Sequence, residues 1–167
     1  MNVLSITRVV AIFCSGVMAG LLFGDWLGPS FARAAMEPSS FIQFQQIVHI
    51  NYLRTLPPLT MGAIAAPILW LIILRGRPRS AEFKLLVGAI VAVAMGSAIT
   101  FVFNIPVNIQ LETWNVASPP ANAREIWSQW EKAHVVRTIF YAVGFFLETV
   151  ALVTSASHRH ETSNHAM

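Results

Sequence analysis

Residues 127–141, WSQWEKAHVVRTIFY, place aromatic and ionisable side chains at helical spacing where an apolar run begins. On a helix that turns about 100° per residue, these side chains and a later glutamate fall within an arc of roughly 80°. The resulting stripe consists of Trp127, Trp130, His134, Arg137, Tyr141 and Glu148. Because such groups are costly against lipid, we expect the stripe to face a bundle interior or a hydrated cavity. An interfacial aromatic belt anchored by Arg137 is the alternative interpretation.

A second polar face lies earlier in the chain and consists of Ser97, Thr100, Asn104 and Asn108. Pro106 has no backbone N–H, so we expect the turn before it to be disturbed and the carbonyl near Val102 to be freed. The face is predicted to form a polar wall of a pocket. Alternatively, its asparagines hold neighbouring helices together.

A third group of polar residues lies in SSFIQFQQIVHINYLRTLPPL, residues 39–59. A serine can cap a helix here, and Pro57–Pro58 predict its end. One face of this helix carries Phe41, Gln45, His49 and Tyr52, with Arg54 near its end. We expect these side chains to contribute to the same pocket. An amphipathic helix lying on the membrane surface is the alternative.

These residue types suit proton transfer and the stabilisation of negative charge. Histidine titrates near neutral pH and can act as a general base. Arginine and asparagine N–H groups can stabilise an oxyanion, most strongly where water is excluded. Tryptophan and tyrosine provide flat apolar walls for an aromatic ligand. Asp25 adds a carboxylate, which we expect to pair with Arg54 or Arg137.

The composition predicts that lipid surrounds these residues, because 55% of the 167 residues are hydrophobic and only 11% are charged. Four apolar runs, residues 9–28, 59–74, 85–103 and 135–153, are long enough to cross a bilayer core of about 30 Å. All four are predicted to be helices, since backbone groups in lipid need internal partners. The first run is longer than the core of an ordinary signal peptide and is interpreted as a retained span.

The predicted fold is an all-α, membrane-spanning four-helix bundle over residues 1–156, with an extra amphipathic helix in the first long loop. Residues 157–167 form a polar tail, for which we expect disorder rather than metal binding by its histidines. The short loop at residues 75–84 is rich in arginine and lysine, so we expect it and both termini to be cytoplasmic. Both long loops then lie on the opposite side, where the polar groups converge.

Other functional classes find little support in the sequence. The net charge is +3, but the basic residues are scattered and no nucleic-acid-binding motif occurs, so no nucleic acid partner is expected. Cys14 is the single cysteine and is interpreted as a packing residue, with no metal pattern around it. The expected partners are the lipid bilayer and a hydrophobic aromatic small molecule, and the oligomeric state is left open.

Three blocks of the sequence, QQIVHINYLRTLPPL, NIPVNIQLETWN and WEKAHVVRT, resemble in order and spacing the anthrone oxygenase-like membrane proteins. The resemblance extends from about residue 10 to residue 155, while residues 117–127 depart from the family's arrangement. It implies four membrane helices and, as in many bacterial members, a bacterial cytoplasmic membrane. The residues that match the family's motifs are His49, Tyr52, Arg54, Asn104, Pro106, Asn108, Trp114, Trp130, His134 and Arg137.

The resemblance also implies an activity, the oxidation of an anthrone- or quinol-like polycyclic aromatic by molecular oxygen with neither metal nor organic cofactor. In this hypothesis His134 or His49 is the base, and Arg54 and Arg137 stabilise the oxyanion. Substrate would contact Tyr52, Asn104, Asn108, Trp114, Trp130 and Tyr141. The alternative is a non-catalytic carrier or accessory protein for an aromatic or quinone ligand. A third possibility is a haem held by His49 and His134.

Overall fold

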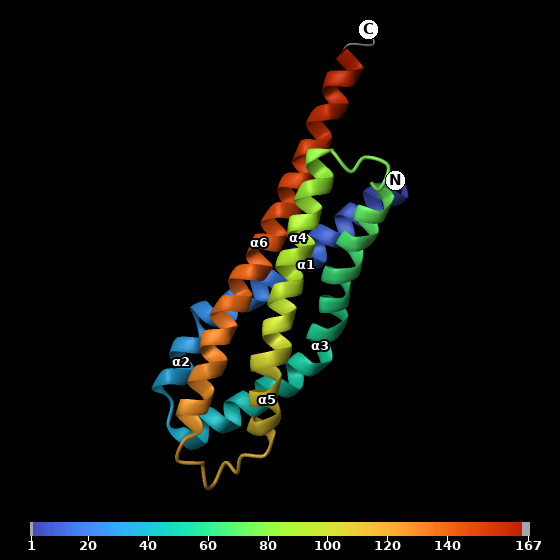
Figure 1. Ribbon diagram of the computed structural model, residues 1–167. Helices are drawn as coiled ribbons and strands as arrows, with labels where there is room; N and C mark the ends of the chain where they lie inside the picture. The colour runs from blue at the N-terminus through green and yellow to red at the C-terminus, as the bar shows by residue number, and fades with distance from the viewer. Residues whose placement is uncertain (1, 165–167) are drawn as a thin grey trace.

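The computed structural model describes the backbone of residues 2–164 and the side chains of residues 2–155. Within this part every regular element is helical, which confirms the predicted all-α fold. In chain order the elements are α1 (Val3–Leu27), α2 (Pro29–Ala35), α3 (Pro38–Ile73), α4 (Ala81–Ile99), the π-helical turn η1 (Thr100–Asn104), α5 (Ile105–Glu112) and α6 (Ala123–Asn164) (Figure 1).

Four helical stretches of this part are long and apolar enough to cross a membrane: Val3–Ala35, Pro38–Ile73, Ala81–Glu112 and Ala123–Ser155. Apart from Leu74 at the end of the second, the predicted spans lie inside these stretches, which extend beyond them because helix continues into both long loops. By the length and composition of its helices, the chain is therefore an integral membrane protein.

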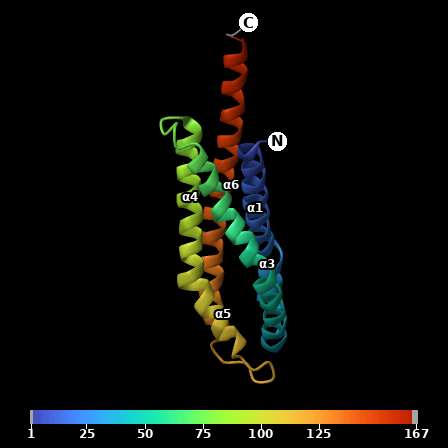
Figure 2. The ribbon, with the colours of Figure 1, turned by 90° about the vertical axis from the view of Figure 1, so that its right-hand side faces the viewer.

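Two pairs of helices, α4 with α6 and α1 with α3, make the most extensive contacts in the bundle. Helix α4 packs along α6, and α1 packs against both α3 and α6. Figure 2 shows α3 running obliquely, from beside the end of α1 to the beginning of α4. Two glycines allow α4 and α6 to approach closely, since a Cβ at Gly96 would lie 2.9 Å from the Tyr141 ring and one at Gly144 would lie 2.7 Å from Val93.

The predicted separate amphipathic helix is wrong as an element, because α3 is continuous from Pro38 to Ile73 with three prolines inside it. Each proline removes one backbone hydrogen bond and bends the helix without having to end it. A continuous helix leaves fewer unpaired backbone groups near lipid than a break would. Figure 1 shows the resulting change of direction in the middle of α3.

The disturbance predicted before Pro106 is confirmed as the π-helical turn η1. Here the N–H of Ile105 bonds to the carbonyl of Thr100, five residues back. Helix α5 then continues from α4 with Pro106 in its first turn. The wide turn changes the face that Asn104 presents, and Asn104 is fully buried.

Both long loops meet at one end of the bundle around an apolar core. This core joins the beginning of α3, α5 and the beginning of α6. Its buried members are Phe41, Ile42, Val107, Leu111, Trp114, Ala123, Trp127 and Trp130. The predicted convergence of the two loops on one side is thus confirmed, and the core fixes the polar residues that follow it on each helix.

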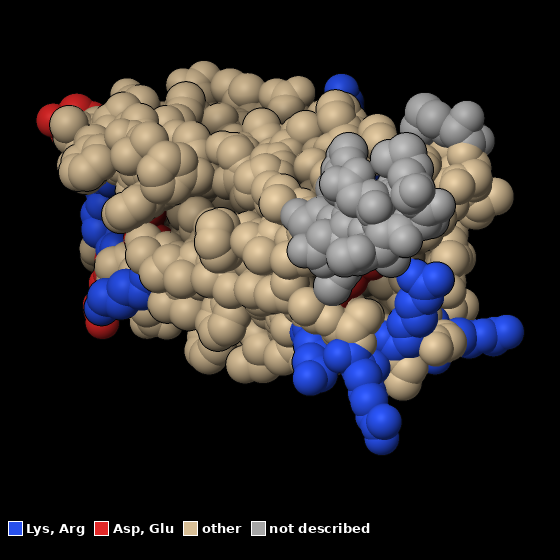
Figure 3. Space-filling view, turned by 90° about the horizontal axis from the view of Figure 1, so that it is seen from above, with Lys and Arg blue, Asp and Glu red and all other residues tan. Residues whose placement is uncertain are grey.

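The opposite end carries the loop between α3 and α4. Arg75, Arg77, Arg79 and Lys84 are exposed there, and Figure 3 shows basic side chains projecting from this end. The polar tail expected from residue 157 stays a prediction, because the side chains from residue 156 onward and all of residues 165–167 lie outside the described residues.

Candidate functional site

The polar and aromatic stripe on α6 faces the interior of the bundle, as predicted. Its six members are all buried, with the exposed fraction of each residue no greater than the 8% of Arg137. They are Trp127, Trp130, His134, Arg137, Tyr141 and Glu148. The interfacial-belt interpretation is therefore wrong for this stripe, because belt residues would lie on the outer surface.

Three rings of the stripe form a continuous stack. The centroids of Trp127 and Trp130 are 4.5 Å apart, and those of Trp130 and His134 are 4.8 Å apart with only 9° between their planes. The guanidinium groups of Arg33 and Arg137 lie 5.6 Å and 5.2 Å from the Trp130 ring centroid. The π electrons of the Trp130 ring therefore stabilise these two cations.

The hydrogen bonds of His134 define its tautomer. Arg137 donates from Nε and Nη2 to Nδ1 of His134, at 3.2 Å and 2.9 Å. Since a guanidinium has no acceptor, Nδ1 must supply a lone pair. The ring hydrogen is then on Nε2, which lies 3.0 Å from the carbonyl of Leu22 and 3.4 Å from Oδ2 of Asp25. His134 is thus a neutral imidazole whose two nitrogens are both occupied.

Arg137 itself is a buried cation with neutral partners. Among the described side chains, its one hydrogen-bond partner besides His134 is the hydroxyl of Thr100, at a long 3.4 Å from Nη1. Within the part of the chain whose side chains are described, it forms no ion pair with a carboxylate. Asp25, Tyr52 and Tyr141 lie close enough to interact with its charge electrostatically. Two of its five N–H groups therefore have no hydrogen-bond partner among the described side chains.

Asp25 pairs with Arg33, so the predicted pairing with Arg54 or Arg137 is wrong. Arg33 donates from Nη1 and Nη2 to the two carboxylate oxygens of Asp25, at 2.9 Å and 2.8 Å, and from Nε to Glu131 at 3.0 Å. The Glu131 carboxylate also accepts from the indole N–H of Trp127, at 2.9 Å. Because α2 turns the chain back after Gly28, it brings Arg33 over the end of α1.

Asn104 and Trp130 leave polar atoms without a partner. Nδ2 of Asn104 donates to the backbone carbonyl of Trp130 at 3.1 Å. Oδ1 of Asn104, Nε1 of Trp130 and Oε1 of Gln45 are buried, yet none has a hydrogen-bond partner among the described residues. Gln45 lies one turn after Phe41 and Asn104 lies one turn before Val107, both members of the loop-side core. Buried polar atoms of this kind are satisfied by water or by a ligand.

His49 has a different partner from His134. Its Nε2 is 3.1 Å from Oε1 of Glu112 on α5, and its side chain is 12% exposed. No protein group in the described part contacts its other ring nitrogen. Glu112 therefore orients His49 and leaves Nδ1 accessible.

The other predicted site residues differ in burial and in their distance from the His134–Arg137 pair. Tyr52 is half-buried and lies within electrostatic range of Asp25, Arg33 and Arg137. Arg54 is exposed and Asn108 is half-buried, and neither has a hydrogen bond or ion pair in the described part of the chain. Trp114 is packed into the loop-side core, where its carbonyl accepts from Gln46 at 2.9 Å. Contacts thus link Asn104, Trp130, His134 and Arg137. Tyr141 and Tyr52 interact electrostatically with Arg137, and Trp114 joins Trp130 through the loop-side core. Arg54 and Asn108 are not part of this cluster.

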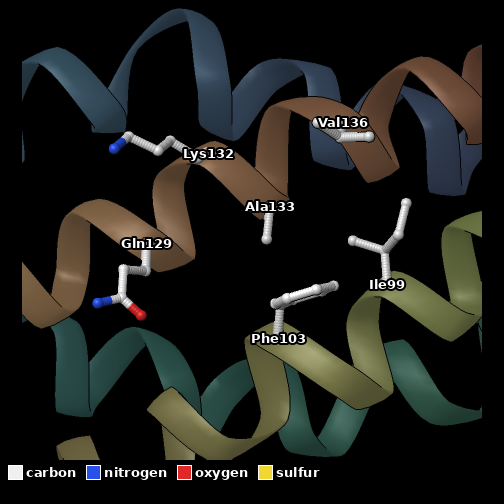
Figure 4. Close-up of a pocket in the computed structure, with 6 residues that line it drawn as sticks. All are labelled: Ile99, Phe103, Gln129, Lys132, Ala133 and Val136. Carbon is white, nitrogen blue, oxygen red and sulfur yellow. The ribbon is translucent and has the colours of Figure 1, made fainter.

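Two surface grooves lie near this cluster. One, of about 370 Å³, lies between α4 and α6, where Ile99 and Phe103 point towards Ala133 (Figure 4). The other, of about 360 Å³, lies between α3 and α4 and includes Ser97. Neither is lined by His49, Asn104, His134 or Arg137, so these four residues do not share either groove. The cluster is closely packed beneath them.

Residues that sequence reasoning missed are those whose partners are distant in the chain. Arg33, Glu131 and Glu112 each hold a candidate residue in position. Glu131 had a detectable signal, since it follows Trp127 by four residues on one helix. Arg33 and Glu112 gave none, because their partners depend on how α2 and α5 fold back.

Comparison with protein families places this chain. The model of the anthrone oxygenase family matches residues 44–147, more than half of the chain. This range contains His49, Asn104, Glu112, His134 and Arg137, whereas Asp25 and Arg33 precede it. Among curated proteins and solved structures, no significant match is found.

Proposed function

Because the chain belongs to the anthrone oxygenase family, we propose that it is a membrane-embedded oxygenase that needs no cofactor. Its substrate is a polycyclic aromatic of the anthrone or quinol type, and molecular oxygen is the co-substrate. The observation that carries this proposal is Arg137, a buried cation whose protein partners are neutral.

A buried arginine without a carboxylate is costly unless an anion joins it. Deprotonation of an anthrone gives an anion whose negative charge lies largely on oxygen. Free N–H groups of Arg137 can donate to this oxygen. The anion that the reaction produces is thus the kind of partner that Arg137 lacks within the protein.

His49 is the better candidate for the base. Its Nε2 faces Glu112, so its Nδ1 lone pair is available to accept a proton. Nδ1 of His134, by contrast, already accepts two hydrogen bonds from Arg137. We therefore assign proton removal to His49 and the positioning of Arg137 to His134.

The reaction balances without a further reductant or oxidant. His49 removes one proton from the CH₂ carbon, and the anion gives one electron to O₂, forming a carbon radical and superoxide. These two combine through a new C–O bond to a peroxide anion, which takes the first proton back from His49 and becomes a hydroperoxide. Loss of the second hydrogen as a proton then breaks the O–O bond, forming a C=O group and hydroxide, which takes up a proton. One substrate and one O₂ give one quinone and one water.

The test is to incubate the purified protein in lipid vesicles with emodin anthrone in air, and to follow emodin formation and oxygen uptake together. We expect one O₂ per emodin and a rate well above the spontaneous one. Arg137→Lys should lower the rate by about 100-fold, as the loss of an oxyanion donor does elsewhere. Arg77→Lys, in the exposed loop at the other end, is the matched control. A wild-type rate no faster than the buffer rate would refute the oxygenase.

The occupation of both nitrogens of His134 favours a second candidate, a non-catalytic carrier for the same class of ligand. A carrier needs the arginine and the aromatic wall but no free base beside them. In that case emodin would bind to the vesicles in an Arg137-dependent manner, and emodin anthrone would cause no oxygen uptake above the spontaneous rate.

A further inference from the structure

The groove between α3 and α4 differs in character from the cluster beneath it. Its walls are apolar, and the side chains that line it include Pro67, Ile68, Ala94, Ala98 and Phe101. The exposed fractions of Ile68 and Phe101 are 37% and 67%, so the groove is open at the surface. Because these residues lie within the membrane-spanning stretches, that surface faces lipid.

A single polar side chain, that of Ser97, lines this groove in the part of the chain that is described. The Ser97 hydroxyl donates to the carbonyl of Val93 at 2.9 Å and lies 2.9 Å from the hydroxyl of Tyr141. Since the hydrogen of Ser97 is used by Val93, the Tyr141 hydroxyl donates to Ser97. The oxygen of Tyr141 therefore keeps lone pairs for a ligand hydroxyl.

The polar end of the groove is continuous with the candidate site. Thr100 follows Ser97 by one helical turn and accepts from Arg137. Tyr141 follows Arg137 by one turn on α6 and interacts with its charge. Val93 and Ile64, which line the groove, also belong to the apolar cluster that contains Tyr141. The groove is thus linked through Ser97 to Tyr141, which lies one turn from Arg137 on α6.

We propose that this groove is the lateral entrance through which a flat, phenolic polycyclic aromatic passes from the bilayer towards Arg137, with an oxygen directed at the Ser97–Tyr141 pair. The ligand class rests on the proposed function, while the groove and its polar end are observed independently of it. The volume of about 360 Å³ lies within the range of small-molecule sites. A lipid acyl chain would fit the apolar walls but would leave the hydroxyl pair unused.

The test fills the groove. In Ala98→Trp and Ala94→Trp the indole fills the groove, so kcat/KM for emodin anthrone should fall by roughly tenfold or more. Ala98→Leu, a smaller change, should give an intermediate loss. Met95→Trp is the matched control, since Met95 neighbours Ala94 on α4 and is 47% exposed but does not line the groove. Its kcat/KM should stay close to the wild-type value.

Emodin binding, followed by its absorbance change in the same vesicles, separates the two proposals. Binding that is weakened in Ala98→Trp but not in Met95→Trp, without any turnover, would refute the oxygenase and support the entrance. Variants that retain wild-type unfolding temperatures, turnover and emodin affinity would overturn the entrance. A wild-type protein that neither oxidises emodin anthrone nor binds emodin would overturn both. If Ala98→Trp unfolds, the same criteria apply to Ala98→Leu and to Ser97→Ala, which removes the polar end alone.

Discussion

Arg137 and His134 form a pair in which the arginine donates twice to one nitrogen of a neutral imidazole, at 3.2 Å and 2.9 Å. They are separated by three residues on α6, so the helix itself brings them together. The imidazole is held in turn by the Leu22 carbonyl and by its stack on Trp130. His134 therefore fixes the direction of the guanidinium.

This relationship predicts non-additive effects on turnover. His134→Phe keeps a ring on Trp130 but removes the acceptor, and Arg137→Lys removes the planar fork. Each should lower kcat/KM. The double variant should be little worse than the less active of the two single variants, because both changes disrupt one unit. Losses that simply multiply would show that His134 acts on the substrate by itself.

Two buried arginines predict opposite effects on stability. Arg33 holds the buried Asp25 and the half-buried Glu131, so Arg33→Met leaves a buried carboxylate without its cation and should cost about 3–5 kcal/mol of unfolding free energy. Arg137 has no carboxylate partner, so Arg137→Met should leave stability unchanged or raise it, by up to about 4 kcal/mol. Denaturant unfolding in micelles measures both. Equal destabilisation by the two changes would mean that Arg137 is a structural residue.

The sequence was sufficient to predict features that repeat along one helix. Apolar length identified all four spans, and the spacing of Trp130, His134 and Arg137 identified the buried face of α6. The disturbance at η1 followed from Pro106 alone. In each case the physical cause acts within a few residues.

Features that depend on tertiary arrangement were not predictable in this way. Pro57 and Pro58 indicated a helix end, yet packing and the absence of water in lipid favour a continuous α3. The Asp25–Arg33 pair requires the turn at Gly28, and the His49–Glu112 pair requires α5 to lie beside α3. No local pattern records either arrangement.

The surroundings of Glu148 predict that its buried carboxyl group can be replaced by an amide with little change in stability. It is fully buried, Ser15 donates to its Oε1 at 3.1 Å, and its Oε2 has no partner in the described part. Because no cation faces it there, Glu148→Gln should change the unfolding free energy by no more than about 1 kcal/mol. Glu148→Lys should prevent folding, since it buries an unpaired charge. A large loss in Glu148→Gln would show that the carboxyl group has a charged role.

The charge of the loop between α3 and α4 predicts the orientation of the chain. With Cys14 replaced by serine, Ser80→Cys reports on this loop and Asn115→Cys reports on the segment between α5 and α6. A maleimide that cannot cross membranes should label Asn115→Cys in intact cells, and Ser80→Cys only after permeabilisation, because basic loops stay in the cytoplasm. The reverse pattern would place the candidate site on the cytoplasmic side.

The His49–Glu112 pair predicts a separation of catalysis from binding. If His49 removes the substrate proton, His49→Gln should lower kcat by about 100-fold or more while the affinity for emodin is kept, because a general base acts in the transition state. Glu112→Gln should give a smaller loss in kcat, since Gln keeps the shape of the side chain beside Nε2 but no longer stabilises the imidazolium that forms. Glu125→Gln, an exposed change near the start of α6, is the control and should have no effect. The pair is a base only if this order holds in stopped-flow measurements of emodin anthrone oxidation. A large kcat loss in His134→Phe with normal kcat in His49→Gln would instead assign the proton transfer to His134, and would require Arg137 to leave Nδ1 when substrate binds.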